Sequence, residues 1–113
     1  MTRLVTELLD EGLKLRRFPG VAYRSGPAGR RAGLVSGPDV WEVIRDLRSA
    51  PCEGMERAQF LADEAGLPVD SVLLAADYYT EHPEEIDRLI EVNERAAEEI
   101  RAQLDRRERL LSQ

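Results

Sequence analysis

The stretch Leu61-Ala62-Asp63-Glu64-Ala65-Gly66-Leu67-Pro68, followed by Val72 and Ala75, decides the fold of this 113-residue chain. Ala62 is small enough for two helices to approach, and Gly66 suits the left-handed turn that ends the first of them. Leu67, Val72 and Ala75 then fill the wedge between the helices. The spacing predicts a helix-turn-helix, and it leaves open an ordinary helical hairpin with the same spacing.

Apolar periodicity on either side of this turn predicts three helices, over residues 40–47, 55–65 and 70–81. We expect their buried faces to be Val40, Trp41, Val43, Ile44 and Leu47, then Ala58, Leu61, Ala62 and Ala65, then Val72, Leu73, Ala75, Ala76 and Tyr79. The last helix is then expected to turn Pro68, Asp70, Ser71, Leu74, Asp77 and Tyr78 outward. It contains no Arg or Lys, so the architecture does not by itself imply that this helix reads DNA.

The segment before these helices is basic. Its pattern predicts a helix from Thr2 or Thr6 to about Arg17, then short strands over residues 21–24 and 31–35 around the turn at 25–29. Between residues 12 and 38 every charged side chain is basic: Lys14, Arg16, Arg17, Arg24, Arg30 and Arg31. We hypothesise that Arg24, Arg30 and Arg31 form a DNA-binding arm. A protein partner, acid pairs between subunits, or plain solvation are the alternatives.

A long helix is expected from Pro83 or Glu84 to the C-terminus. Steps of four and three residues form a heptad seam of Ile86, Ile90, Asn93, Ala97, Ile100, Leu104, Arg107 and Leu111. We expect a protein partner to contact Asn93, Ala97, Ile100, Leu104 and Leu111, with Glu94 and Glu98 adding charge. The alternative is that the helix packs back on its own bundle through Ile86 and Ile90.

The composition of the chain argues against disulfide, metal and cofactor chemistry. The net charge is −6, with a single cysteine, Cys52, and a single histidine, His82. We therefore expect no internal disulfide, no metal site and no cofactor, and no catalytic residue is assigned. His82 before Pro83 is interpreted as a cap or turn residue. No apolar run is long enough to span a bilayer, which leads us to expect a cytoplasmic protein.

Together these patterns predict a mainly α fold: a helix-turn-helix (tri-helical, homeodomain-like) core with a short N-terminal β-hairpin arm and a long C-terminal helix. The chain is expected to form one domain in three parts. Residues 1–38 hold the N-terminal helix and basic arm, residues 39–82 hold the core, and residues 83–113 hold the acidic helix. Residues 36–39, Ser-Gly-Pro-Asp, supply the start signal for the core.

Several segments resemble one known family. They are Gly29-Arg30-Arg31-Ala32-Gly33, Pro38-Asp39-Val40-Trp41-Glu42-Val43-Ile44, the turn Gly66-Leu67-Pro68, and Tyr78-Tyr79-Thr80-Glu81-His82-Pro83-Glu84-Glu85-Ile86-Asp87. In these the chain resembles the family called domain of unknown function 433, over about residues 21–93. The resemblance implies a helix-turn-helix-like core and, as in many of its members, likeness to VapB-type antitoxins paired with a PIN-like ribonuclease toxin. It implies no catalytic residue. The chain departs from the family at residues 35–38, where members commonly have a Gly-Thr-Arg-type signature.

The resulting hypothesis is a non-enzymatic antitoxin of a type II toxin-antitoxin system. Its acidic C-terminal helix is expected to lie across a basic cleft of a PIN-like ribonuclease toxin, and the hypothesis leaves room for autoregulation by DNA binding. We also expect a homodimer, and neither a membrane nor a small-molecule partner. The alternatives are a stand-alone DNA-binding transcriptional regulator and a structural dimerisation or adaptor module.

Overall fold

The computed structural model describes residues 3–26, 29–35 and 37–113, which form five helices and one two-stranded antiparallel sheet. In chain order the elements are α1 (Arg3–Arg17), β1 (Val21–Gly26), β2 (Gly29–Leu34), α2 (Val40–Arg48), α3 (Met55–Ala65), α4 (Val69–Glu81) and α5 (Pro83–Leu111). The predicted mainly helical class is confirmed at this level. Thr2, the turn residues 27 and 28, and Ser36 lie outside the described residues.

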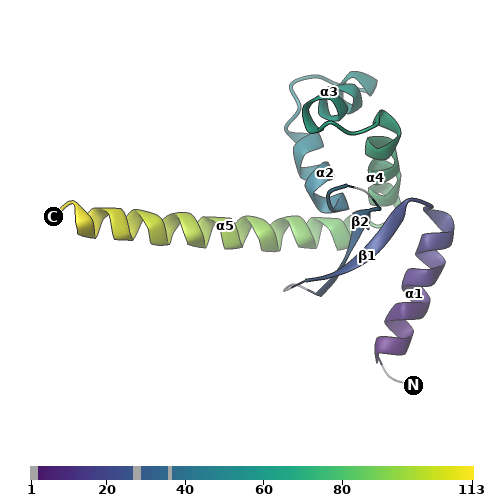
Figure 1. Cartoon of the computed structure of the whole chain (residues 1–113), viewed down its shortest axis with the longest axis horizontal. Coiled ribbons are helices and arrows are strands. Elements are labelled where there is room, and N and C mark those ends of the chain that lie inside the picture. The colour runs from purple at the N-terminus through teal and green to yellow at the C-terminus, as the bar shows by residue number, and fades with distance from the viewer. Residues whose placement is uncertain (1–2, 27–28, 36) are drawn as a thin grey trace.

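The elements form a folded body with two projections. The hairpin and helices α2, α3 and α4 lie together, while α5 extends far to one side and α1 leaves the opposite end (Figure 1). A single core joins the parts, because its buried side chains come from the hairpin, from α2 to α4 and from the first turns of α5. These are Phe18, Val21, Ala32, Leu34, Val40, Trp41, Val43, Ile44, Ala58, Leu61, Ala62, Val72, Ala75, Tyr78, Ile86, Leu89 and Ile90.

The hairpin pairs in antiparallel register from Val21 opposite Leu34 to Gly26 opposite Gly29. The second strand begins two residues earlier than the sequence indicates, at Gly29, and it ends at Leu34. Val21 and Leu34 are buried at the base of the hairpin. A two-stranded hairpin is marginal alone in water, so this anchoring in the common core stabilises it.

The turn between α3 and α4 has the backbone geometry that the sequence predicts. Gly66 is left-handed, with φ of +67° and ψ of 34°, and the N–H of Leu67 donates to the carbonyl of Ala62 at 2.9 Å. That bond satisfies one of the carbonyls left open at the end of a helix. Pro68 then precedes the first residue of α4.

The buried face of α4 differs from the sequence prediction. Tyr78, expected outside, is fully buried, whereas Leu73, Ala76 and Tyr79 are only half-buried. The buried positions follow steps of three residues, Val72, Ala75 and Tyr78. Burial of Tyr78 is stable because its hydroxyl meets polar partners from β1 and α5, which α4 alone does not reveal. Two other expected core residues are less buried: Leu47 is half-buried, and Ala65 is exposed beside the turn.

The corner between α4 and α5 is held by side chains from both helices. Pro83 starts α5, and His82 is the residue that α4 and α5 share as their boundary. The hydroxyl of Tyr79 donates to Asp87 at 2.9 Å, and Arg48 donates to the same carboxylate oxygen at 2.7 Å. Arg48 lowers the pKa of Asp87 through this hydrogen bond, with Tyr79 adding a second one.

Helix α1 turns its polar side toward the body. Glu11 is buried, with 8% of its surface exposed, and Lys14 contacts Glu85 of α5 at 3.3 Å. The apolar side chains that are described on α1 point outward instead: Val5, Leu8, Leu9 and Leu13 are all exposed. Among the described side chains of α1, charge pairs rather than apolar contacts therefore connect the helix to the body.

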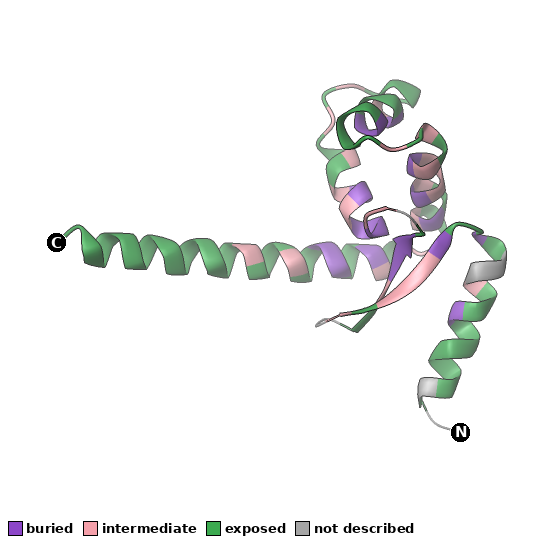
Figure 2. Cartoon of the chain, viewed as in Figure 1, coloured by how far each residue is buried: buried purple, intermediate pink, exposed green. Residues whose placement is uncertain are grey.

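Helix α5 is far longer than the body it packs against. It has 29 residues, about 43 Å at 1.5 Å per residue, and its buried residues are Ile86, Leu89 and Ile90 near the start. Every residue from Glu98 onward is exposed (Figure 2). Among the described residues, no helix combines the length and apolar character needed to cross a membrane.

Candidate partner-binding surface

The three arginines predicted to contact DNA lie on the hairpin, and two of them meet one carboxylate. Arg24 and Arg31 are directly opposite each other in the two strands. Arg24 Nη1 donates to Asp39 Oδ1 at 2.6 Å, and Arg31 Nε donates to Asp39 Oδ2. The indole N–H of Trp41 also donates to Asp39, at 3.2 Å. Asp39 is 5% exposed and is therefore a buried anionic centre between the hairpin and α2.

Arg24 is fixed by the backbone as well. Its Nη2 donates to the carbonyl of Gly37 at 2.8 Å and to the carbonyl of Leu34. A Cβ on Gly33 would lie 2.7 Å from the guanidinium carbon of Arg24, so a glycine there lets the side chain cross the hairpin closely. Charge-assisted bonds of this kind are about twice as strong as neutral ones, and the guanidinium loses its freedom to reach an outside ligand.

Arg30 is paired with α1. Its Nε donates to Glu11 Oε2 at 2.6 Å and its Nη2 donates to Glu11 Oε1 at 2.8 Å. This is a bidentate contact, the geometry in which an arginine and a carboxylate match best. The hydrogen bond with Glu11 raises the pKa of Arg30 above its usual value.

The acids that pair with the arm were missed because they lie immediately outside the basic stretch. The acid-free segment covers residues 12–38, and the partners are Glu11 and Asp39, one position beyond each end. Both acids could have been found in the sequence, because each stands one position outside the acid-free segment. DNA binding by the arm stays a prediction, but its positive charge is largely offset within the chain.

The predicted partner-contact residues of α5 fall into two groups. Asn93 and Ala97 are half-buried, and Asn93 donates its amide N–H to the carbonyl of Leu89 at 2.7 Å. Ile100, Leu104 and Leu111 are exposed, at 58%, 45% and 77% of their surface. The acids Glu94 and Glu98 are also exposed. The seam thus begins in the body and continues beyond it without cover.

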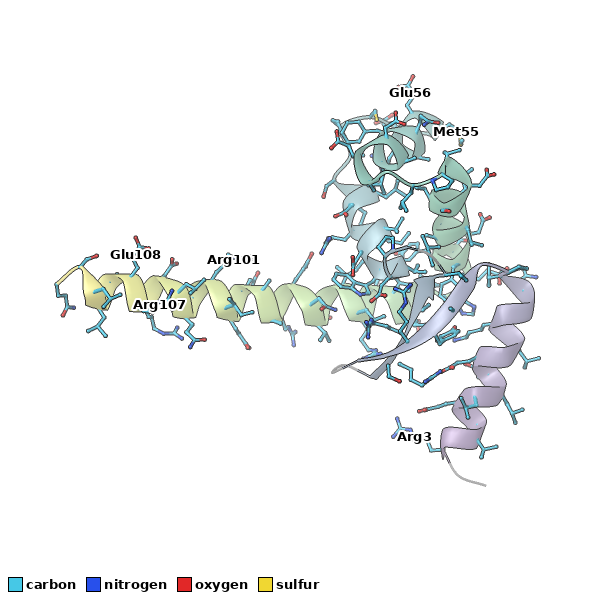
Figure 3. The ribbon with its side chains drawn as sticks, viewed as in Figure 1. Arg3, Met55, Glu56, Arg101, Arg107 and Glu108 are labelled. Atoms are coloured by element: carbon cyan, nitrogen blue, oxygen red, sulfur yellow. The ribbon has the colours of Figure 1, made fainter. Side chains whose placement is uncertain are left out.

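The part of α5 that stands free is basic, although the whole helix was expected to act as an acidic element. We call residues 83–99 the inner segment and residues 100–113 the outer segment. The outer segment has four arginines and two acids: Arg101, Arg106, Arg107, Arg109, Asp105 and Glu108. Figure 3 shows Arg101, Arg107 and Glu108 projecting from α5 where no other part of the chain lies beside it.

A cleft of about 510 Å³ lies where α5 leaves the body. It is lined by Arg31, Asp39, Trp41, Glu42, Leu89, Val92, Asn93 and Ala96. Val92 is exposed there, and Trp41 is only just buried. Partial burial raises the pKa of Glu42, and the neighbouring Asp39 raises it further. Trp41 and Glu42 come from α2 and Val92 comes from α5, so only the tertiary structure brings them together.

His82 and Cys52 are the single histidine and the single cysteine of the sequence. The ring of His82 lies 4.8 Å from that of Tyr78 and 6.0 Å from that of Phe18, measured between centroids. Cys52 is a free, half-buried thiol. Within residues 3–26, 29–35 and 37–113, no group of three or more His, Cys, Asp or Glu side chains is arranged to hold a metal ion.

Comparison of the chain with family models, with curated proteins and with solved structures finds no match.

Proposed function

We propose that this chain is a non-enzymatic regulator of the antitoxin type, which acts by docking the outer segment of α5 onto a PIN-like ribonuclease toxin. One observation carries the proposal: Ile100, Leu104 and Leu111 continue the seam of Ile86 and Ile90 beyond the body, with their side chains exposed. Spaced apolar residues on one side of a free helix are the anchors of helix-in-groove recognition.

In this proposal the two segments of α5 affect different steps of toxin binding. Glu94 and Glu98, at the end of the inner segment, would speed encounter with a basic rim, while the apolar anchors of the outer segment slow dissociation. The arginines of the outer segment require acidic groups beside the groove that receives them. The toxin surface proposed here therefore has mixed charge, and it is not uniformly basic.

We further propose that α2, α3 and α4 form a tri-helical, homeodomain-like helix-turn-helix core. The left-handed Gly66 between α3 and α4 and the buried faces of all three helices support this arrangement. Helix α4 has no Arg or Lys, so the unit is better suited to packing than to entering a DNA groove.

Likeness to the domain of unknown function 433 family is part of the same proposal. Its most specific segment, residues 78–87, has a structural role here, because Tyr78 and Tyr79 bind the carboxylates of Glu85 and Asp87. A segment with this role would be kept among related chains because it holds the corner between α4 and α5. It therefore supports likeness in fold and does not by itself support a catalytic role.

A stand-alone DNA-binding regulator remains the second candidate. The observation that favours it is that Arg24 and Arg31 share one carboxylate, which leaves one positive charge in excess beside Asp39. Phosphate affinity rises with the number of free cations, so a single excess charge gives weak binding.

Co-expression with the protein of the neighbouring gene tests the leading proposal. Four forms are compared: the full chain, a chain ending after Asn93, Ile100→Ala with Leu104→Ala, and a control with exposed Met55 changed to Ala on α3. The full chain and the control should restore growth and co-purify with the toxin, and the other two should not. Full rescue by a folded chain that ends at Asn93 would overturn the proposal.

A further inference from the structure

The charges of α5 are segregated along its length. The inner segment has seven acids and two arginines: Glu84, Glu85, Asp87, Glu91, Glu94, Glu98, Glu99, Arg88 and Arg95. The outer segment has the opposite balance. Interaction with the helix dipole favours acids at the start and cations at the end, but it falls off within the terminal turns. It therefore explains Glu84 and Arg109 but not Glu91 to Glu98, nor Arg101.

The outer arginines also form no ion pair with the described part of the chain. Arg101, Arg106, Arg107 and Arg109 share this with Arg57 and Arg88, whereas these arginines do form one: Arg3, Arg17, Arg24, Arg30, Arg31, Arg45, Arg48 and Arg95. Arg101 follows exposed Ile100 and Arg107 lies on the seam itself, so this part of α5 fits an apolar surface with acids beside it.

Such a surface lies at the base of α5 on the chain itself. The cleft beside Trp41 is lined by the apolar groups Leu89, Val92 and Ala96, with Glu42 at its wall. Glu42 forms no ion pair with any described residue, and the exposed acid Glu94 flanks the seam on the same stretch of α5. The outer segment cannot fold back on this cleft, because α5 is one continuous helix.

We infer that a second copy of this chain provides the contact, with the two α5 helices antiparallel, so that the basic outer segment of each lies along the acidic inner segment of the other. The end of the outer segment then reaches the partner's cleft beside Trp41 and Glu42. Two equivalent contacts form, as the two-fold symmetry of a closed dimer requires.

Antiparallel pairing also accounts for Arg107. This residue occupies a seam position, and in a parallel pair it would face the Arg107 of the other copy across the interface. In the antiparallel pair each Arg107 lies opposite the inner segment, where acids predominate. Like charges at such a position disfavour the parallel arrangement.

Self-pairing and toxin docking use the same apolar side chains, Ile100 and Leu104. The homodimer is therefore the form present without toxin, and the toxin competes with the second copy for the same side of α5. This competition rests on the proposed function, whereas the pairing itself does not.

Charge reversal in the full chain tests the pairing, with association measured by sedimentation or light scattering. Reversing a charge that flanks the seam, either in the outer segment (Arg101→Glu) or in the inner segment (Glu94→Arg), should each raise the dimer Kd about tenfold. Combining the two changes should restore it, because opposite charges face each other again only if the helices are antiparallel. A wild-type chain that is monomeric at micromolar concentration would overturn the inference, and so would a combined variant as weak as its parents.

Cross-linking gives a reading that does not depend on how well the reversed variants fold. In a Cys52→Ser background, Gln113→Cys should not form an intermolecular disulfide, since antiparallel helices hold the two C-termini far apart. A mixture of Asn93→Cys and Leu104→Cys chains should cross-link more than either chain alone. Rapid self-linking through residue 113 would show a parallel pair and overturn the proposal. Growth rescue by the chain ending at Asn93 would contradict toxin docking and leave the pairing intact.

Discussion

The hydroxyl of Tyr78 donates a hydrogen bond to Oε2 of Glu85, 2.8 Å away, and joins the end of α4 to the first turns of α5 across Pro83. The hydroxyl of Tyr23 from β1 is hydrogen-bonded to the same phenol, and Nζ of Lys14 from α1 approaches the same carboxylate oxygen at 3.3 Å. The buried phenol of Tyr78 thus connects α4 with β1 and α5, and the carboxylate of Glu85 adds α1 to the same network.

Tyr78→Phe should lower the free energy of unfolding by about 1 to 3 kcal/mol, because it leaves Glu85 and the Tyr23 hydroxyl short of a partner in a partly buried place. Urea unfolding followed by circular dichroism measures the change. Tyr79→Phe is the matched control: its hydroxyl contacts the exposed Asp87, and its loss should cost less than about 1 kcal/mol. Equal effects at the two positions would contradict this account of the corner.

The surroundings of Tyr78 also predict how the free energy of unfolding changes at alkaline pH. Burial, followed by its hydrogen bonds with Tyr23 and Glu85, raises the pKa of Tyr78 far above its usual 10.0. Burial likewise raises the pKa of Tyr23. The neutral phenols are favoured in the fold, so their contribution is complete below pH 10 and is lost as pH rises above it. Unfolding free energies measured from pH 8 upward should fall above about pH 10, and less steeply in Tyr78→Phe.

Asp39→Asn should destabilise the fold, because two guanidinium groups would lose their shared anion. Arg24 and Arg31 are each mostly covered, so the expected loss is about 1 to 3 kcal/mol. Thermal unfolding gives the comparison, with exposed Asp105→Asn as the control. Arg31→Ala should destabilise in the same direction, so any test of DNA binding by this residue needs a parallel stability measurement. An unchanged Tm for Asp39→Asn would mean that the buried pairs contribute nothing.

Two glycine substitutions should act with opposite signs. Gly66→Ala forces a side chain into left-handed backbone and should cost about 1 to 2 kcal/mol. Gly12→Ala, inside α1 with nothing within 4 Å of the added carbon, should stabilise that helix by up to about 1 kcal/mol. Chemical denaturation of both variants checks the signs. A neutral result at Gly66 would contradict the geometry of the α3–α4 turn.

The two segments of α5 should differ sharply in their effect on folding. Leu89→Ala in the inner segment removes a fully buried side chain and should cost about 2 to 5 kcal/mol. Ile100→Ala with Leu104→Ala should change stability by less than about 0.5 kcal/mol at concentrations where the chain is monomeric. A large loss in the second variant would show that the outer segment packs on its own body.

The amino-acid sequence by itself determined the local structure. Helix boundaries fall within one or two residues of those predicted from Gly66, Pro83 and the apolar periodicity, because capping, turn geometry and period depend on neighbouring residues along the chain. The seam of α5 follows from the same periodicity.

Only the tertiary structure decided which polar groups meet. Glu11 and Asp39 neutralise the arm, Tyr78 rather than Tyr79 is buried, and α1 turns its charged side inward. The reason is physical: ion pairs and buried hydroxyls depend on distances between segments far apart in sequence, and a side chain's preference for water changes once a partner is placed beside it. The same holds for α5, whose outer segment is recognised as free, and as basic, only once the extent of the folded body is known.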